Sequence, residues 1–163
     1  MGTEPNREEK QAIYDRVAGE ISAVIEGETS SIARMATVSN ILHYTFDHFF
    51  WTGFYQVDPL KEDELVVGPY QGTMGCLRIP FGRGVCGTAA ASGDIQIIDD
   101  VHAFPGHIAC DPNSRSEIVV PVHDANGKLI AVFDVDSDQP AMFDDCDGRN
   151  LAAIVQSAFG AVR

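Results

Sequence analysis

The sequence predicts a single α+β domain, built on an antiparallel sheet with helices packed on one face. Three observations predict it. Apolar residues recur with helical spacing in the first 49 residues and again near the C-terminal end. The segments between them are rich in β-branched and aromatic residues and are bounded by turn residues. No regular crossover helices separate these segments, as a parallel sheet would require.

The length supports one domain, because 163 residues with 45% hydrophobic side chains can bury one sizeable core. We expect the domain to span residues 1–163, with residues 1–9 forming a loose N-terminal segment.

Two helices are expected before the sheet. Apolar residues spaced by four, four and three run from Ile13 to Val24, which places them on one helix face. Gly27 ends this helix, and Thr29 or Ser30 can cap the second one. The strand candidates that follow share β-branched and aromatic residues and are 50–57, 64–70, 77–79, 95–98, 117–122 and 128–136.

The connections between these strands complete the prediction. Asp58-Pro59 and residues 61–63 form the first turn, and the Asn-Gly pair within 124–127 is typical of a hairpin. A short Ala-rich helix is expected at 85–92, and a last helix runs from about residue 144 to 162.

A long irregular segment, residues 99–115, holds two of the five histidines, two prolines and Cys110. Loops of this length inside a compact domain are usually functional or disordered. Because the flanking segments are strongly patterned, we expect a functional lid.

The charge balance excludes several classes of partner. Eleven basic and 24 acidic side chains give a net charge of -13, which disfavours binding to nucleic acid and to anionic membrane surfaces. No apolar run approaches the roughly 18 residues of a spanning helix, and the first ten residues show no apolar signal core. We therefore expect a cytoplasmic protein.

The four cysteines are Cys76, Cys86, Cys110 and Cys146. Structural disulfides are uncommon in a reducing compartment, and the intervals of 10, 24 and 36 include no CxxC pair that would favour zinc. His107 with Cys110 would offer only two ligands, so we expect no metal. Inert buried thiols and thiol redox chemistry both remain open.

Gly82, Gly84 and Gly87 match the G-x-G-x-x-G pattern of dinucleotide-binding proteins, and Asp99 follows at a distance that could serve the ribose. The context disfavours this interpretation, because the helix is short and no further βαβ unit follows. Glycines also make tight turns and permit close helix packing, which explains the pattern without a ligand.

Several longer runs carry a family resemblance. They are CLRIPFGRGVCGTAAA at 76–91, DVHAFPGHIACD at 100–111, SEIVVP at 116–121, WTGFY at 51–55, VGPYQG at 67–72, FDVDS at 133–137 and FD at 143–144. From about residue 10 onward the chain resembles the free methionine-R-sulfoxide reductases, which are stand-alone GAF-domain enzymes. The GAF fold alone says little about function, because it hosts many ligands. The cysteine spacings and the run ending at Cys110 are specific.

The resemblance implies a GAF fold with a central antiparallel sheet of five to six strands. The N- and C-terminal helices would pack on one face, and a loop-covered pocket would lie on the other. It also implies a homodimer that reduces free L-methionine-(R)-sulfoxide. Cys110 would be the catalytic cysteine, Cys76 the main resolving cysteine and Cys86 an auxiliary thiol. Cys146 has no counterpart in the family pattern.

The resemblance further places Glu117, Asp134 and Asp136 in the substrate pocket, with Trp51 as an aromatic contact. Asp134 and Asp136 are two residues apart on one strand, so they project from the same face. Three crowded acids would raise the pKa of at least one of them and provide a general acid near neutral pH. Which acid binds the ammonium and which protonates the sulfoxide oxygen stays open.

The chemistry suits these residue types. A thiolate attacks the sulfoxide sulfur, a cysteine sulfenic acid forms, and a second thiol condenses with it to a disulfide. No cofactor motif supplies electrons, so we expect thioredoxin to reset the enzyme. The division of the resolving role between Cys76 and Cys86 stays open. His102 and His107 could lower the pKa of the Cys110 thiol or order the lid.

The main alternative is a non-enzymatic GAF sensor that binds a small ligand, or that senses oxidants through Cys110. A sensor normally accompanies an output domain, for which we expect no room in this chain. The Asn-Lys pair that marks cyclic-nucleotide GAF domains is also missing from the sequence.

Overall fold

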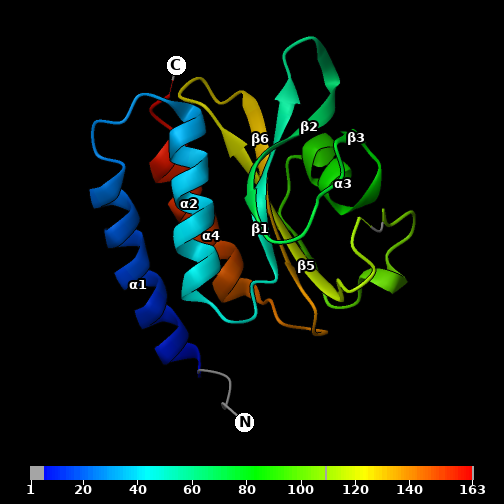
Figure 1. The fold of residues 1–163 in the computed structure, drawn as a ribbon, viewed down its shortest axis with the longest axis horizontal. Helices are drawn as coiled ribbons and strands as arrows, with labels where there is room; N and C mark the ends of the chain where they lie inside the picture. The colour runs from blue at the N-terminus through cyan, green and yellow to red at the C-terminus, as the bar shows by residue number, and fades with distance from the viewer. Residues whose placement is uncertain (1–5, 109, 163) are drawn as a thin grey trace.

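The computed structural model describes residues 6–108 and 110–162 (Figure 1). Its elements, in chain order, are α1 Arg7–Val24, α2 Ser31–Thr45, β1 Trp51–Asp58, β2 Lys61–Gln71, β3 Arg78–Pro80, α3 Gly84–Ser92, β4 Gln96–Ile98, a 3-10 helix Val101–Ala103, β5 Ser116–His123, β6 Leu129–Ser137 and α4 Asp145–Phe159.

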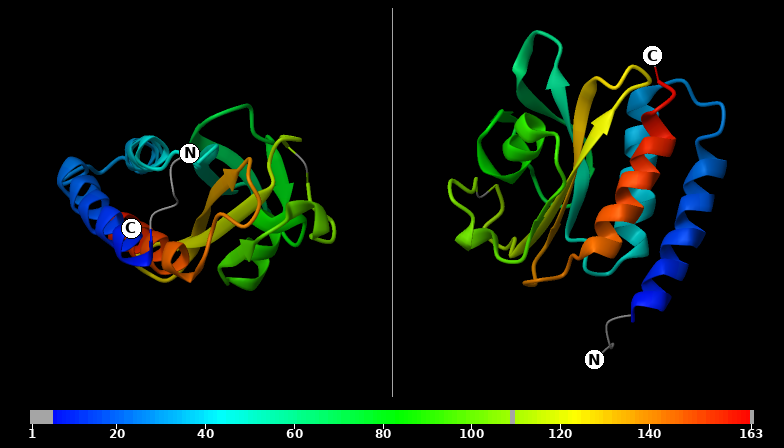
Figure 2. Two further views of the ribbon diagram at one scale, coloured as in Figure 1. Left: turned by 90° about the horizontal axis from the view of Figure 1, so that it is seen from below. Right: turned by 180° about the vertical axis from the view of Figure 1, so that it is seen from behind.

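The six strands form one antiparallel sheet in the order β3-β2-β1-β6-β5-β4. Helices α1, α2 and α4 cover one face, and α3 lies on the opposite side with the long loops (Figure 2). This arrangement confirms the predicted fold class. None of the helices in the described ranges has the length and apolar character needed to cross a membrane.

The last helix ends at Phe159 rather than near residue 162. Two predicted boundaries earlier in the chain are also wrong, and in both cases local hydrogen bonds explain the difference. Residues 7–9, expected to be loose, form the first turn of α1, because the Asn6 side chain accepts the Glu9 N–H and the Glu9 side chain accepts the Asn6 N–H. Residues 61–63, expected in a turn, belong to β2, because Asp58 Oδ1 accepts the Leu60 N–H and closes a tighter turn. Residues 1–5 of the expected loose segment lie outside the described residues.

Alternation along β5 and β6 divides the interior into two layers. Ile118, Phe133 and Val135 point to the helical side and pack there with residues of α1, α2 and α4. Val119 and Val132 point to the other side and pack with residues of β1, β2 and α3. Any side chain of β5 or β6 in phase with Val119 or Val132 therefore faces the loops and α3, on the side of the sheet away from α1, α2 and α4.

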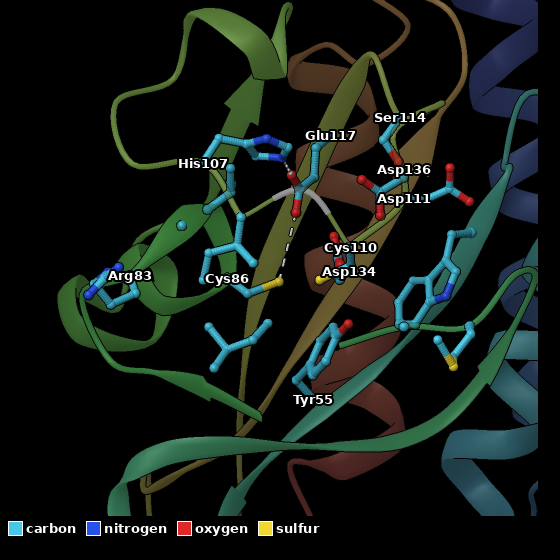
Figure 3. A pocket seen from close by; sticks show the side chains of 17 residues that line it. Tyr55, Arg83, Cys86, His107, Cys110, Asp111, Ser114, Glu117, Asp134 and Asp136 are labelled. Atoms are coloured by element: carbon cyan, nitrogen blue, oxygen red, sulfur yellow. Dashed lines mark hydrogen bonds and ion pairs between the residues drawn. The ribbon is translucent and has the colours of Figure 1, made fainter. Parts of the chain in front are cut away.

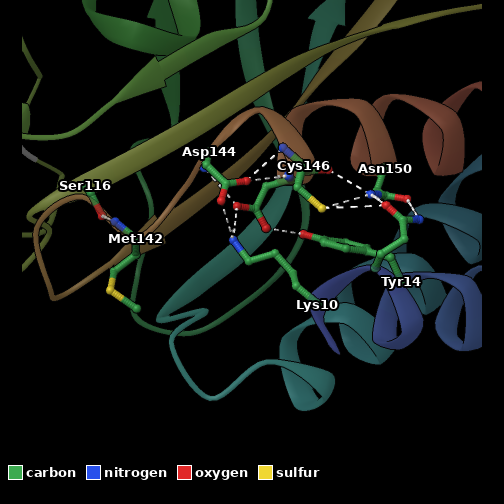
Figure 4. Close-up of polar contacts among 9 residues, drawn as sticks. Lys10, Tyr14, Ser116, Met142, Asp144, Cys146 and Asn150 are labelled. Carbon is green, nitrogen blue, oxygen red and sulfur yellow. Dashed lines mark hydrogen bonds and ion pairs between the residues drawn. The ribbon is translucent and has the colours of Figure 1, made fainter. Parts of the chain in front are cut away.

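A buried polar cluster ties α1 to the start of α4 (Figure 4). Asp147 accepts hydrogen bonds from Tyr14 Oη at 2.7 Å and from Lys10 Nζ at 2.8 Å. Cys146 is buried beside this cluster, with its Sγ 3.7 Å from Gln11 Oε1. It thus lies in the helical layer, on the opposite side of the sheet from the loops.

The three glycines of the G-x-G-x-x-G pattern form the tight turn that leads from β3 into α3. Gly82 and Gly84 have φ values of +81° and +61°, and a Cβ at Gly87 would lie 2.4 Å from the Pro80 carbonyl oxygen. The Gly82 N–H also bonds the Gly87 carbonyl at 2.8 Å. Because every strand pair in the described sheet is antiparallel, the βαβ context of a dinucleotide site does not arise there.

Candidate active site

A pocket lies on the loop side of the sheet, between the strands, the first turn of α3 and the segment 99–115, which we call the lid. Figure 3 shows the side chains that line it. Six of the seven site residues predicted from the sequence are among them. The seventh, Cys76, forms a disulfide with Cys110, which lines the pocket. The predicted members that line the pocket are Trp51, Cys86, Cys110, Glu117, Asp134 and Asp136.

The three acids meet because of strand register. Asp136 on β6 pairs with Glu117 on β5 and with Trp51 on β1, so one row across three strands carries an aromatic ring and two carboxyl groups. Asp134 lies two residues farther along β6 and faces the same side, paired with Gly53 on β1. Glu117 and Asp134 are 5% and 4% exposed. The pairing brings together acids that lie 17 to 19 residues apart in the chain.

Burial and mutual repulsion favour the protonated forms of these acids. Burial raises the pKa of Glu117 well above its ordinary value, and the charges of Asp134 and Asp136 raise it further. Burial likewise raises the pKa of Asp136, with a smaller contribution from Asp134. For Asp134, burial raises the pKa to about 6. One carboxyl oxygen of Asp134, Oδ1, is buried without a hydrogen-bond partner among the described residues.

Cys76 and Cys110 form a disulfide at the edge of this pocket, with a Cα–Cα distance of 5.3 Å. The bond joins the β2–β3 loop to the lid. A hydrogen bond runs in parallel with it, from Thr73 Oγ1 to Asp111 Oδ2 at 2.5 Å. Both cysteine side chains are partly exposed, so an external thiol can approach the bond.

Cys86 lies deeper than the disulfide and is a free thiol. Its Sγ is 3.8 Å from Glu117 Oε1. Burial raises the pKa of Cys86 well above its ordinary value, and the neighbouring Asp134 and Glu117 raise it further. The structure therefore keeps Cys86 as a neutral thiol beside the acids.

Trp51 forms an aromatic wall of the pocket. Its ring stacks on Tyr55 and Tyr70, with centroid distances of 5.5 and 5.0 Å. Its indole N–H donates to the Thr73 carbonyl at 2.8 Å, which fixes the ring beneath the loop that carries Cys76.

The chain matches known proteins over most of its length. Residues 9–160 match the GAF domain model. Free methionine-R-sulfoxide reductase from Escherichia coli is 44% identical, over 90% of this chain and 86% of its own. The X-ray structure of free methionine-R-sulfoxide reductase from Neisseria meningitidis, in complex with its substrate, is 45% identical with a TM-score of 0.87, covering 91% of this chain and 87% of its own. The reduced form of fRMsr from Staphylococcus aureus is 40% identical with a TM-score of 0.86, covering 98% and 97%.

The chain belongs to the free methionine-R-sulfoxide reductase family of GAF domains. This membership confirms the predicted family, the predicted fold and the prediction that the protein is an oxidoreductase.

Some lining residues of this GAF domain were not predicted, or were predicted only as alternatives. His107 points at the acids, with Nε2 3.8 Å from Glu117 Oε2, and burial lowers its pKa. His102 is exposed and does not line the pocket. Arg83, Tyr55 and Ser114 also line it. For Arg83, its position between Gly82 and Gly84 could have indicated a pocket residue. As a binding site, this turn suggested only a dinucleotide.

One set of metal-ligand atoms occurs in the described part of this GAF domain. Donor atoms of Cys86, Glu117 and Asp134 lie within 4.8 Å of one another. The sequence suggested no metal, since it shows none of the close ligand pairs of a zinc site. Two of these three donors are carboxyl groups, which hold an organic ammonium equally well. The pocket is thus suited to a positively charged group.

Proposed function

We propose that this chain reduces free L-methionine-(R)-sulfoxide to L-methionine. The observation that carries the proposal is the Cys76–Cys110 disulfide at the edge of a pocket lined by Glu117, Asp134 and Asp136. In the proposed reaction the two cysteines exchange electrons with the substrate, and the acids bind its ammonium group and protonate its sulfoxide oxygen. The relatives named above support the same reaction.

In the proposed reaction the Cys110 thiolate attacks the sulfoxide sulfur, and the oxygen passes to the cysteine as a sulfenic acid. The substrate sulfur is reduced by two electrons and the Cys110 sulfur is oxidised by two. The Cys76 thiol then attacks Cys110, forms the disulfide and releases the oxygen as water. Cys86 is buried and neutral, which supports an auxiliary role.

The acids divide the remaining tasks. A neutral carboxyl group is required to donate a proton to the sulfoxide oxygen, and an ionised one to hold the ammonium. Glu117 and Asp136 have pKa values well above the ordinary range, which suits the proton donor. Asp134, with a pKa of about 6, is ionised at neutral pH and suits the ammonium.

A dithiol must then reduce the disulfide, and we propose thioredoxin in the cytoplasm, with no bound cofactor. The partly exposed disulfide supports this choice, since the adjacent Met74 and Leu77 are 79% and 72% exposed and leave the approach open. We further propose a homodimer and a role in repairing the oxidised free amino acid under oxidative stress, both on the basis of the family resemblance.

NADPH consumption with thioredoxin and thioredoxin reductase tests the proposal. The free R-sulfoxide, the S epimer and the N-acetylated R-sulfoxide are offered separately. We expect turnover of the free R form alone. Cys110→Ser abolishes it, and Cys146→Ser, on the far side of the sheet, serves as the matched control. No turnover of any substrate by the reduced, folded protein would reject the enzyme in favour of a ligand sensor.

A further inference from the structure

We infer that the external dithiol attacks the Cys76 sulfur of the disulfide, not the Cys110 sulfur, and that Met74 and Leu77 form the surface on which this reductant docks. The inference rests on the proposed function, in which a protein dithiol of the thioredoxin class reduces the disulfide after each turnover. It adds which sulfur is attacked and which side chains the partner contacts.

The two sulfurs of the disulfide differ in what lies behind them. Cys110 lines the pocket together with Glu117, Asp134 and Asp136, whereas Cys76 is not among the described residues that line it. Figure 3 shows Cys110 among these acids. In thiol–disulfide exchange the attacking sulfur approaches in line with the bond, from the side opposite the sulfur that leaves. An attack on Cys110 therefore comes from the pocket, and an attack on Cys76 comes from outside it.

Charge also favours an attack on the outer sulfur. The attacking species is a thiolate, which is repelled by neighbouring negative charge. Asp111 directly follows Cys110, and the hydrogen bonds that its carboxylate accepts lower its pKa and keep it ionised. The immediate neighbours of Cys76 in the chain are Gly75 and Leu77, which carry no charge. A thiolate therefore meets less repulsion at Cys76 than at Cys110.

The loop that carries Cys76 exposes two large apolar side chains. Met74, two residues before this cysteine, is 79% exposed, and Leu77, directly after it, is 72% exposed. Single exposed apolar side chains are common on protein surfaces, but these two flank a sulfur that the partner has to reach. A protein whose reactive cysteine lies within an apolar surface can cover both side chains while its thiolate contacts Cys76.

The loop is held in place by the sheet beneath it. The Trp51 indole N–H donates to the Thr73 carbonyl at 2.8 Å, and the Val67 N–H donates to the Leu77 carbonyl at 3.0 Å. Between these two bonds, Gly75 is buried against the Trp51 ring, where a Cβ would lie 3.0 Å from Cζ2. Because the backbone is fixed at three points, a docking partner has little loop motion to restrict.

The exchange proceeds in two steps. The partner's thiolate bonds to the Cys76 sulfur, the Cys76–Cys110 bond breaks, and Cys110 leaves with the electron pair as a thiolate. The partner's second thiol then loses its proton to water and attacks the partner's bonded sulfur, which releases Cys76 to take up a proton. This chain gains two electrons and the partner loses two. Cys110 is thus released on the pocket side, where the proposed reaction requires its thiolate.

Trapping the mixed disulfide tests which sulfur is attacked. The oxidised chain is mixed with a thioredoxin variant that keeps only its attacking cysteine, the reaction is quenched with acid, and free thiols are alkylated before peptide mass spectrometry. The chain carries Cys86→Ser, which removes the free thiol that lines the pocket and prevents exchange onto it. We expect the partner on Cys76 and the alkyl group on Cys110. The opposite arrangement, or no link to Cys76, overturns the inference.

A matched pair of leucines tests the docking surface. Leu77→Ser removes an apolar side chain that is not among the described residues lining the pocket, unlike Met74. Leu60→Ser is the control, because Leu60 is 94% exposed in the β1–β2 turn, at the other end of β2 from this loop. The second-order rate constant for reduction of the disulfide by thioredoxin should fall about three- to tenfold in Leu77→Ser and stay within about twofold in Leu60→Ser.

Dithiothreitol separates docking from the reactivity of the disulfide, because it is too small to use the apolar surface. Its rate constant should change by less than about twofold in Leu77→Ser. A loss equal to that with thioredoxin, or no loss with thioredoxin, overturns the docking surface. None of these measurements contains a sulfoxide, so they do not depend on the proposed function. Turnover of the free R-sulfoxide driven by dithiothreitol tests that function on its own.

Discussion

The hydrogen bond between Thr73 and Asp111 should help to hold the two disulfide-bonded cysteines, Cys76 and Cys110, together. Thr73 lies three residues before Cys76, and Asp111 directly follows Cys110, so the bond connects the same two loops as the disulfide. Asp111 is well suited to accept it, because this hydrogen bond and the Asn113 N–H lower its pKa and keep it ionised. Replacing Thr73 with Val removes the donor at nearly constant volume.

The expected magnitude follows from the exposure of the pair. A hydrogen bond to a charged group contributes about 1.5–3 kcal/mol when protected, but a solvent-accessible pair contributes nearer about 0.5–1 kcal/mol. Because about 30 mV corresponds to about 1.4 kcal/mol for a two-electron couple, Thr73→Val should raise the reduction potential by about 10–20 mV. The equilibrium constant for disulfide formation should fall about two- to fivefold.

The assay is equilibration with glutathione redox buffers, followed by acid quenching and separation of the reduced and oxidised forms. Thr73→Ser keeps the hydroxyl group and should restore the original midpoint. Thermal unfolding of each oxidised variant controls for a general loss of structure. A midpoint in Thr73→Val equal to that of the unmodified protein would refute the reasoning, since the bond would then contribute equally to both redox states.

Three other outcomes are expected. Cys86→Ser should keep most of the thioredoxin-dependent turnover, measured by NADPH consumption, whereas Cys110→Ser keeps none. Asp134→Asn should raise the free energy of unfolding by about 1–3 kcal/mol at pH 7, measured by urea titration. The folded-state pKa of Asp134, about 6, exceeds the ordinary value of 3.8, so the folded state binds this proton more tightly than the unfolded state does. The unmodified protein therefore loses stability as the pH rises through that window. The same variant should lose the part of this pH dependence that Asp134 contributes, while Glu117 and Asp136 keep theirs. Tyr14→Phe leaves buried Asp147 with one donor fewer and should lower the free energy of unfolding by about 1–3 kcal/mol without changing turnover.

The sequence allowed the elements of the fold to be predicted because their patterns are local. The spacing from Ile13 to Val24 identified α1, and the Asn-Gly turn before Lys128 identified the β5–β6 hairpin. The errors lie at element ends. Residues 7–9 and 61–63 have no hydrophobic period of their own, and a cap and a tight turn decide their conformation.

The site was harder to predict because it depends on contacts between distant segments. Two of its acids were visibly in phase on one strand, but the pairing of Glu117 with Asp136 depends on strand register, which no single segment specifies. The choice of Cys76 rather than Cys86 as the partner of Cys110 depends on where two loops meet. The spacing of the cysteines leaves both partners possible.

The same property of Glu117, Asp134 and Asp136 affects both the stability of the fold and the proposed chemistry. A negative charge on these buried acids is unfavourable. β5 and β6 alternate between the helical layer and the pocket, so the strands that supply Phe133 and Val135 to the core also hold Asp134 and Asp136 in the pocket. Burial raises the pKa values of these acids and so favours their protonated forms. An ammonium that enters the pocket offsets this effect and favours the ionised form of Asp134. Under the proposed mechanism, substrate binding should therefore release a proton near pH 6. The same burial keeps a neighbouring carboxyl group protonated, as a proton donor to the sulfoxide oxygen requires.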